Sequence, residues 1–430
     1  MKPFKDLFQL KDHQTSVKQE MMAGTIGYFT IVYIIAVNAL ILSEAGIPFE
    51  GAVIATILTS FLGCVVMAFW ANAPILLVPG MGINAMFTYT LVNSGGLSWQ
   101  EALAVVFVSG VVFMVIAFTK LTPVISKAIP QILKEAITVG LGMFLMFIGL
   151  EKGGLIQRGE NAIITIGDFS ELKVLATIIT FLVTIFLFIR NVKGHFLWSI
   201  GFGTLLGFLF GIEPTLNSGS GFGWQEYGSV FGQLSFAPIM KIPFWVAVFS
   251  VTMVLVFENI GLVQGHVNMA GHPHKYKKAF QANAFSALTS GLFGTSPTVS
   301  TVESAAAISA GGRTGLTSLT TGVLFLGSLL FIPYLKWIPD HSIAPILIII
   351  GGLMIQNIRH MDLSDITEAF PAIFIIAMIP FTYSIADGIA IGFIMYPVLK
   401  LATGKAKEVS VPLYIIACLF LMNFIVHSFH

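Results

Sequence analysis

Charged residues are scarce in this chain, and their scarcity excludes most soluble folds. Asp, Glu, Lys and Arg make up 10% of its 430 residues, and 56% of the residues are hydrophobic. A soluble domain carries roughly 25% charged residues. Apolar runs of the length that crosses a bilayer, about 20 residues each, recur from end to end without a long polar region between them. The composition therefore predicts an all-α polytopic membrane protein.

Cysteine is also rare, and the familiar catalytic motifs are absent. Cys64 and Cys418 both fall in apolar runs, so they do not form a disulfide framework. The chain has no HExxH, P-loop or GxSxG motif, and its GxG patterns lack the strand–helix setting of a dinucleotide site. His272 and His274 lie in a basic loop, where a solvated surface is a simpler interpretation than a metal pair. These absences predict that the protein is not an enzyme, holds no metal or other cofactor and does not bind nucleic acid.

The charged residues that are present set the expected topology. The N-terminal stretch MKPFKDLFQLKDHQTSVKQE is charged well before the first apolar run, unlike a cleavable signal peptide. Lysine and arginine concentrate in alternate connections, and cytoplasmic connections carry the excess of these residues. We therefore expect about 14 membrane segments and a cytoplasmic N-terminus. Residues 370–402 include Pro380, Asp387 and Gly388, and they form either one broken span or a hairpin.

Two of the expected spans are interrupted by glycine and proline. In NAPILLVPGMGINAMFTYTLV, residues 75–78 favour a short strand, Pro79-Gly80 ends it, and a helix follows from Gly82 to Tyr89. In GTSPTVSTVESAAAISAGGRTG, residues 295–302 favour a strand and 303–310 a short helix. These are the third and tenth spans, so the pattern predicts two repeats of seven spans, the second inverted in the membrane. Paired interrupted segments of this kind point to a transporter binding site.

The chemistry of such breaks favours a binding chamber. Unpaired backbone groups at membrane depth are costly unless they are buried in protein or line a cavity. A strand that ends where a helix begins leaves free N–H groups at the helix start, and the helix dipole adds to their positive potential. Two such breaks that meet at the midplane would form a small polar chamber.

Two carboxylates lie at plausible membrane depth, Glu258 in the eighth span and Glu303 in the tenth. A charge at the centre of a membrane helix costs roughly 2.5–3.5 kcal/mol, so such residues are functional candidates. Each has a structural alternative. The run Ser300-Thr301-Val302-Glu303 fits a capping box, in which Glu303 only satisfies a backbone donor. Glu258 could instead extend from the cytoplasmic end of its span towards water.

Other polar and aromatic residues near the breaks are weaker candidates. Asn84 follows the Pro-Gly break, where it would either bind a ligand or cap the helix. Phe87 or Phe257 would either stack on a flat ring or pack in the core. Asp387 would likewise either bind a ligand or cap a helix. The acidic residues just before residue 370 are expected to cap a helix.

The chain resembles the AzgA-type purine permeases of the nucleobase–cation symporter 2 group over nearly its whole length. GTSPTVSTVESAAAISAGGRTGLT resembles the tenth-span signature, ANAPILLVPGMGINAMFTYT the third-span motif, and EMMAGTIGYFTIVYIIAVNALIL the first span. The C-terminal block DLSDITEAFPAIFIIAMIPFTYSIADGIAIGFIMYPVLKLATGK is also similar. Where the family reads Phe-Asp-Thr-x-Gly, this chain has Phe257-Glu258-Asn259-Ile260-Gly261, and Pro297 stands where the family often has Thr. Both departures affect the expected base preference.

The resemblance implies two inverted repeats of seven spans arranged as two domains. The core domain would contain 1–120 and 244–335, and the gate domain 121–243 and 336–430. Members import purine bases with protons through the cell membrane, and the resemblance also implies a homodimer. By motif position, Glu258 and Glu303 match the family's acidic residues of the eighth and tenth spans, and Asn84 matches its third-span asparagine.

The expected function is therefore proton-coupled import of a purine base, guanine or hypoxanthine first. Glu258 would accept N–H bonds from the base, and Glu303 would carry the coupling proton, because burial favours the neutral form of a carboxyl group. Adenine, xanthine or uracil transport, or anion transport by the same fold, are the alternatives. The predicted substrate-binding residues are Gly82, Asn84, Phe87, Glu258, Ser296, Thr298 and Glu303, with Glu303 and Glu258 also predicted to couple protons.

Overall fold

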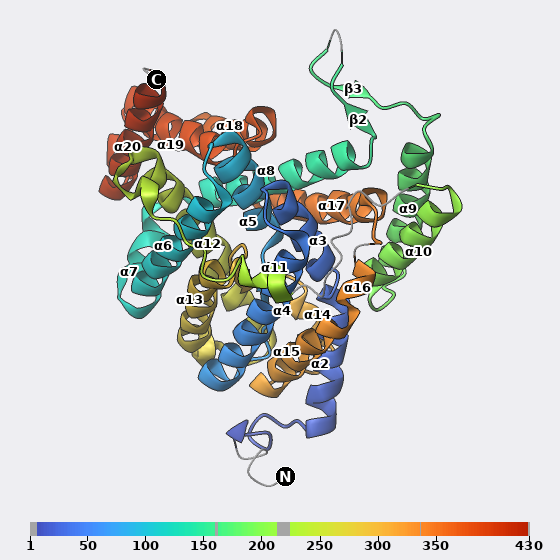
Figure 1. Cartoon of the computed structure of the whole chain (residues 1–430). Coiled ribbons are helices and arrows are strands. Elements are labelled where there is room, and N and C mark those ends of the chain that lie inside the picture. The colour runs from blue at the N-terminus through green and yellow to red at the C-terminus, as the bar shows by residue number, and fades with distance from the viewer. Residues whose placement is uncertain (1–6, 160–161, 213–223, 336, 429–430) are drawn as a thin grey trace.

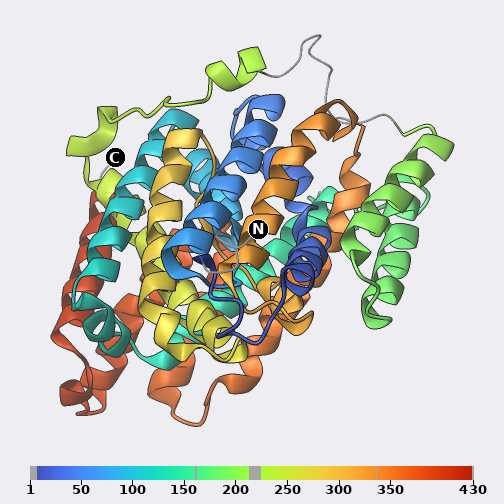
Figure 2. The same cartoon turned by 90° about the horizontal axis from the view of Figure 1, so that it is seen from below.

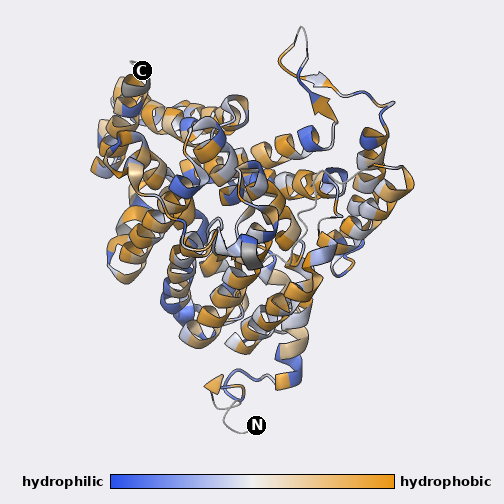
Figure 3. Cartoon of the chain, viewed as in Figure 1, coloured by the Kyte–Doolittle hydropathy of each residue, from blue (hydrophilic) through white to orange (hydrophobic). Residues whose placement is uncertain are grey.

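The computed structural model describes residues 7–159, 162–212, 224–335 and 337–428, and within them the chain is mostly helical (Figure 1). Nine of the described helices are long and apolar enough to cross a membrane, and three shorter apolar helices accompany them. Hydrophobic residues make up most of these helices (Figure 3), and many large apolar side chains are exposed, such as Phe186 and Phe208 at 59% and 81%. Large apolar side chains exposed in this number are typical of a surface that faces lipid. The protein is a multi-pass membrane protein.

The first half of the chain forms the spans that the hydropathy predicts. Its helices begin with capping side chains where polar residues allow, as at Ser16, which accepts from Gln19 N, and at Ser98, which forms a capping box with Glu101. In chain order the elements are α2 (Val17–Ile31), α3 (Ile34–Glu44), α4 (Phe49–Val66), η1 (Met67–Ala71), β1 (Leu77–Pro79), α5 (Met81–Ala85), η2 (Met86–Ser94), α6 (Trp99–Phe118), α7 (Leu121–Ala128), α8 (Gln131–Lys152), β2 (Ile156–Gln157), β3 (Thr165–Ile166), α9 (Leu172–Ile189) and α10 (His195–Leu209).

The second half repeats this order after the short helices α11 (Trp224–Gly228) and η3 (Ala237–Met240). Its remaining elements are α12 (Ile242–Met269), η4 (Pro273–Lys275), α13 (Tyr276–Phe293), β4 (Thr298–Ser300), α14 (Ser304–Ser309), α15 (Gly315–Gly327), η5 (Ser328–Phe331), α16 (Ile332–Leu335), α17 (Asp340–Ile355), η6 (Gln356–His360), α18 (Ile366–Thr382), α19 (Ile385–Ala402), η7 (Ala406–Glu408) and α20 (Val411–Ser428).

Helix pairs between the two halves have counterparts in which both helices are replaced by their equivalents from the other half. The helix α15 packs on α2 and α4, and its equivalent α6 packs on α12 and α13. In the same way α18 packs on α8, and α9 packs on α17. The equivalent pair α8 and α17 pack on each other, and so do β1 and β4, which run antiparallel. Such reciprocal packing is what an inverted repeat of seven spans produces, and the predicted fold class is confirmed.

The helices form two groups with fewer contacts between them than within them. One group contains α2 to α6 and α12 to α15, and the other contains α8 to α10 and α17 to α20. In both views α9 and α10 stand at one side of the molecule (Figures 1 and 2). The helices α8 and α17 approach closely, because a Cβ added at Gly351 would lie 2.4 Å from the Gly142 carbonyl oxygen. Small residues at such crossings let two membrane helices touch through their backbones.

Near the C-terminus, residues 370–402 form a hairpin and not one broken span. Residues 370–402 form parts of α18 and α19, which pack along each other and are joined by a turn at Tyr383. Tyr383 has a φ of 56°, in the left-handed region, so the chain reverses there. Gly388 and Gly392 of α19 lie against Ile379 and Ile375 of α18, an order that fixes the two helices as antiparallel.

Candidate functional site

The two interrupted spans meet in the middle of the protein. Strand β1 pairs with β4 antiparallel, with Leu77 opposite Ser300 and Pro79 opposite Thr298. The amide of Gly80 extends the ladder by donating to the Pro297 carbonyl oxygen at 3.2 Å. Helix α5 begins directly after β1, and α14 begins four residues after β4 ends. The helix starts therefore flank one short, buried two-stranded sheet.

A set of buried polar side chains fixes this sheet. Asn38 of α3 donates to Thr56 and Thr295, and its side-chain oxygen accepts from the Ser296 hydroxyl at 3.0 Å. Asn259 of α12 accepts from the amide of Ser300 at 3.1 Å. These bonds join the first and eighth spans to the tenth. They satisfy polar groups that would be costly to leave unpaired at membrane depth.

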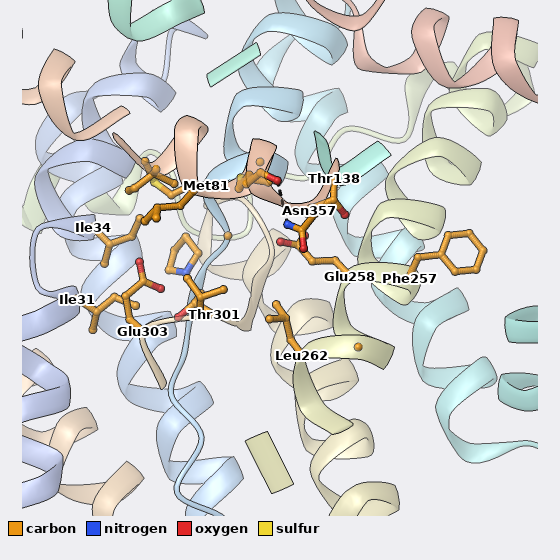
Figure 4. Close-up of a pocket in the computed structure, with 18 of the residues that line it drawn as sticks. Ile31, Ile34, Met81, Thr138, Phe257, Glu258, Leu262, Thr301, Glu303 and Asn357 are labelled. Carbon is orange, nitrogen blue, oxygen red and sulfur yellow. Dashed lines mark hydrogen bonds between the residues drawn. The ribbon is translucent and has the colours of Figure 1, made fainter. Parts of the chain in front are cut away.

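A cavity of about 640 Å³ lies beside the paired breaks (Figure 4). This volume is within the range of roughly 300–1,000 Å³ that small-molecule sites occupy. Helices of both groups line it, so the cavity lies between them. The residues with polar side chains in its lining are Thr30, Tyr33, Gln131, Lys134, Glu135, Thr138, His195, Glu258, Thr301, Glu303, Asn357 and His360.

Glu258 lies well inside α12 and faces the cavity on the side of Thr138 and Asn357 (Figure 4). Its carboxylate therefore does not reach out from the helix end, and the alternative that it extends towards the cytoplasmic surface is wrong. Within the described part of the chain, its Oε2 atom is buried and has no hydrogen-bond partner. A buried carboxylate oxygen without a donor is available for a ligand N–H.

Glu303 lies on the other side of the cavity, near Ile31 and Ile34 (Figure 4). It is the N-cap residue of α14, but its side chain makes no capping bond. The capping-box alternative is wrong, because Ser300 belongs to β4 and its amide bonds to Asn259 instead. The Glu303 Oε1 atom accepts a hydrogen bond from the Tyr33 hydroxyl at 2.6 Å. The side chain therefore points into the cavity, and Tyr33 at the N-terminal end of α3 fixes its position.

Of the other candidates, Gly82 and Phe257 line the cavity. Ser296 and Thr298 are fully buried and satisfied within the protein, Ser296 by Asn38 and Thr298 by Ser286 and Ser290. Phe87 is 1% exposed and belongs to the hydrophobic core. These three side chains stabilise the scaffold behind the cavity.

Asn84 is a separate case. It lies in α5 and is fully buried, outside the cavity lining. Its backbone N–H donates to the Gly80 carbonyl oxygen at 2.8 Å, as in a regular helix. In the described part of the chain, both side-chain polar atoms are buried and lack hydrogen-bond partners. It does not cap the helix with its side chain, since α5 begins at Met81 without a side-chain cap.

The sequence reasoning missed several residues that line the cavity. Tyr33 and His195 lie near Glu303, and Thr138 and Asn357 lie near Glu258. Tyr33 was visible as a hydroxyl in an apolar span. The other three come from spans 5, 7 and 12, which carry no break in their sequence and so gave no local signal.

The cavity is open along one end of the second helix group and closed at the other. It extends to Gln131 and Lys134 at the start of α8, to Phe188 at the end of α9 and to His360 at the end of η6. At the far end of α8, Lys152 forms an ion pair with Glu44 of α3. The same end of the molecule carries the α18–α19 turn, where the Tyr383 hydroxyl donates to Glu151 at 2.7 Å.

A polar cavity between two groups of membrane helices, built on two interrupted spans that pair with each other, defines a membrane transporter. The chain belongs to the Permease family (Xan_ur_permease), whose model matches residues 18–391.

Curated relatives are similar over most of their length. The chain is 50% identical over 382 residues to the nucleobase transporter PlAzg2 of Paenibacillus larvae, covering 88% of this chain and 76% of that one. It is 36% identical to the guanine/hypoxanthine permease PbuO of Bacillus subtilis, covering 97% and 99%. It is 31% identical to the adenine permease AdeP of Escherichia coli, covering 99% and 96%. The resemblance to purine permeases is confirmed.

The fold is shared with a solved transporter of another kind. The transmembrane domain of a cyanobacterial bicarbonate transporter, BicA, matches with a TM-score of 0.66 at 15% identity, covering 86% of this chain and 96% of that one. The murine anion transporter Slc26a9 in its inward-facing state matches with the same TM-score at 11% identity. At this level of identity the likeness concerns the architecture only.

Proposed function

We propose that this protein imports purine nucleobases into the cell together with protons, and that guanine and hypoxanthine are its first substrates. The cavity carries this proposal, because it places an unpaired buried carboxylate oxygen of Glu258 and a second carboxylate, Glu303, beside two helix starts. The names of the relatives support a nucleobase as the cargo. Proton coupling rests on the two carboxylates and on the resemblance.

Glu258 gives the site its preference for an oxopurine. The edge of guanine presents an N–H and an amino group side by side, and both can donate to one carboxylate. Hypoxanthine keeps the N–H alone. Adenine presents an acceptor next to its amino group, and that acceptor would face a carboxylate oxygen, which repels it. Asn357 and Thr138 lie close to Glu258 and would contact the same edge of the base.

Glu303 carries the coupled proton in this proposal. Moving one positive charge through 100 mV is worth about 2.3 kcal/mol, or roughly 50-fold accumulation per proton. A proton that enters with the base would therefore drive uptake against a gradient.

The movement that carries the base is proposed to occur between the two helix groups. The core, 1–120 and 244–335, holds Glu258 and Glu303, and the gate, 121–243 and 336–430, supplies the opposite wall with Thr138, His195 and Asn357. The N-terminus and the open end of the cavity lie at the cytoplasm, because Lys127, Lys134 and Arg190 mark that side. The structure then represents the state that faces the cytoplasm of the cell.

Anion transport by the same fold is the second candidate, since the BicA likeness shows that the architecture also serves an anion. Two carboxylates in the cavity would repel an anion, so this candidate is weaker. Adenine remains an alternative within the family, because AdeP is a relative.

Uptake of labelled hypoxanthine tests the proposal in cells that lack their own purine permeases. We expect uptake that a protonophore abolishes and that excess guanine blocks more strongly than adenine or uracil. Glu258→Gln should lower apparent affinity by roughly 10- to 100-fold, because a charge-assisted bond contributes about 1.5–3 kcal/mol. The matched control is Glu171→Gln at the exposed start of α9. Uptake blocked by bicarbonate, or an unchanged affinity in Glu258→Gln, would overturn the proposal.

A further inference from the structure

His195 opens α10 at the wall of the cavity. It follows Gly194, whose φ of +70° lies in the left-handed region and turns the chain into the helix. A Cβ at Gly194 would lie 3.1 Å from the carbonyl oxygen of Phe29, so the helix start is seated closely against α2. His195 thus belongs to the gate group but lines the same cavity as Glu303 of the core group.

The hydrogen bond of the ring determines its tautomer. Nδ1 of His195 lies 3.1 Å from the carbonyl oxygen of Val192, and a carbonyl only accepts. Nδ1 therefore carries the hydrogen, and neutral His195 has a lone pair at Nε2. Within the described residues, that Nε2 atom is buried and has no hydrogen-bond partner. The rings of Phe188 and Phe196 contact the imidazole edgewise, with centroids 5.3 and 4.2 Å away, and hold it in place.

Glu303 is held in a complementary way. The Tyr33 hydroxyl donates to its Oε1 atom, which leaves the other carboxyl oxygen for a different partner. Tyr33 also contacts Phe196 edgewise with a centroid distance of 5.0 Å, so the two residues that orient Glu303 and His195 touch each other. Glu303 and His195 both line the same cavity. A donor and a free acceptor for one proton therefore face the same space from opposite helix groups.

We propose that His195 takes the transported proton from Glu303 and releases it to the cytoplasm, an assignment that rests on the proposed function. In this step the O–H bond of the Glu303 carboxyl group breaks and an N–H bond forms at His195 Nε2. The products are a carboxylate and an imidazolium, and total charge is conserved. The imidazolium then gives its proton to water at the open end of the cavity. No hydrogen bond joins the two side chains in this structure, so the transfer requires them to close on each other. Both line the cavity that opens at the cytoplasmic end in this proposal, which ties proton release to that state.

The other titratable groups around the ring do not offer the same function. Tyr33 already donates to Glu303, and the side chains of Arg190 and Lys193 on the turn before α10 offer donors and no acceptor. On α17, His341 bonds the Gly203 carbonyl two turns further along α10. Across the cavity lie Lys134, Glu135, Glu258 and His360. Of the two histidines in the lining, His360 is exposed, whereas His195 presents a buried, unpaired Nε2.

His195→Asn is the sharpest test, because the asparagine amide can still donate to the Val192 carbonyl while the titratable Nε2 is removed. The full-length protein is reconstituted in proteoliposomes. Equilibrium exchange of labelled hypoxanthine, which moves no net proton, is compared with accumulation driven by a proton gradient between pH 6 and 8. We expect exchange within about twofold of the unmodified protein, at least a 10-fold loss of driven accumulation, and a flattened pH profile. His274→Asn, in the exposed η4 turn, is the matched control and should keep both.

Each result decides one question. Driven accumulation and a pH profile in His195→Asn that equal those of the unmodified protein would overturn the role of His195 alone. Absence of gradient-driven accumulation in the unmodified protein would overturn proton coupling and this assignment together. Should His195→Asn lose exchange as well, His195→Gln is the second variant, since its amide occupies the position of Nε2 without titrating. Exchange with lost accumulation in that variant supports the proposal, and retained accumulation overturns it.

Discussion

Lys152 at the end of α8 forms an ion pair with Glu44 at the end of α3. The second carboxylate oxygen of Glu44 accepts from the Tyr89 hydroxyl at 2.8 Å. Tyr89 and Phe144 both contact the ring of Tyr383, with centroids 5.5 and 5.2 Å away. These contacts join the two helix groups at the end opposite the open cavity, so they close that end.

Removing the cation should loosen this closure. Lys152→Met keeps the length of the side chain and loses the pair, which is worth about 1 kcal/mol for a partly exposed pair and shifts a two-state equilibrium about 5-fold. The readout is Thr138→Cys on the cavity wall, in a Cys418→Ser background, labelled by an impermeant maleimide added outside intact cells. We expect slow labelling that Lys152→Met accelerates several-fold.

Lys241→Met is the matched control, because Lys241 is exposed at the start of α12. It should leave labelling unchanged. Equal labelling in Lys152→Met and in the parent would contradict the assigned closure. Fast labelling in the parent itself would contradict the assigned sidedness, since the cavity would then open to the outside.

Asn259 should contribute strongly to stability. Its side-chain oxygen accepts from Asn283 at 2.6 Å and from the Ser300 amide at 3.1 Å. Asn259→Val leaves both donors unpaired in the core, at a cost of about 1–3 kcal/mol for each group. We expect a fall of several degrees or more in the melting temperature in detergent. Asn268→Val, at an exposed position of the same helix, should change it little, and equal effects of the two would refute the interpretation.

Two adjacent glycines in α17 should respond oppositely to alanine. A Cβ at Gly351 would lie 2.4 Å from the Gly142 carbonyl oxygen, whereas one at Gly352 meets only the flexible end of Met146 at 3.4 Å. Gly351→Ala must push α8 and α17 apart and should destabilise the protein by about 1–3 kcal/mol. Gly352→Ala should be neutral or slightly stabilising, because alanine favours helix. Thermal unfolding of both variants side by side decides this, and similar melting temperatures would count against the close crossing.

Acid should release the N-terminal segment from the surface on which it packs. Phe8 and Leu10 are buried there, and Nζ of Lys275 lies 3.1 Å from Nε2 of His13. Burial and then the Lys275 charge lower the pKa of His13, and the same two causes lower the pKa of His272 to about 4. Both rings are neutral in the docked state. Their contribution to stability is present above about pH 6.5 and is lost as the pH falls towards 4.

Hydrogen exchange of residues 7–14 measures this docking, after correction for the intrinsic pH dependence of exchange. Protection should be higher at pH 7.5 than at pH 5. The double variant His13→Gln and His272→Gln should show a flatter dependence, because neither glutamine titrates. Protection that rises on acidification would contradict the predicted direction of the pH dependence.

The class of fold could be predicted from the sequence alone. Its hydropathy predicted the spans, and glycine and proline marked the two interrupted segments within a few residues of β1 and β4. The same local signals singled out Glu258 and Glu303 as carboxylates in apolar surroundings. These features depend on residues that are near one another in the chain, so they can be read without knowing which helices touch.

Only the tertiary structure decided which side chains meet. Ser300 and Glu303 fit a capping box by spacing, but pairing of β4 with β1 and the bond to Asn259 place Ser300 in a strand. Ser296, Thr298 and Phe87 lie near the breaks in sequence and yet pack behind the cavity. Tyr33 bonds Glu303 and His195 lines the same cavity, although both come from spans more than 100 residues away in the sequence. Hydropathy and spacing report the environment of a segment, whereas a cavity forms where distant segments pack, and that depends on contacts no local pattern encodes.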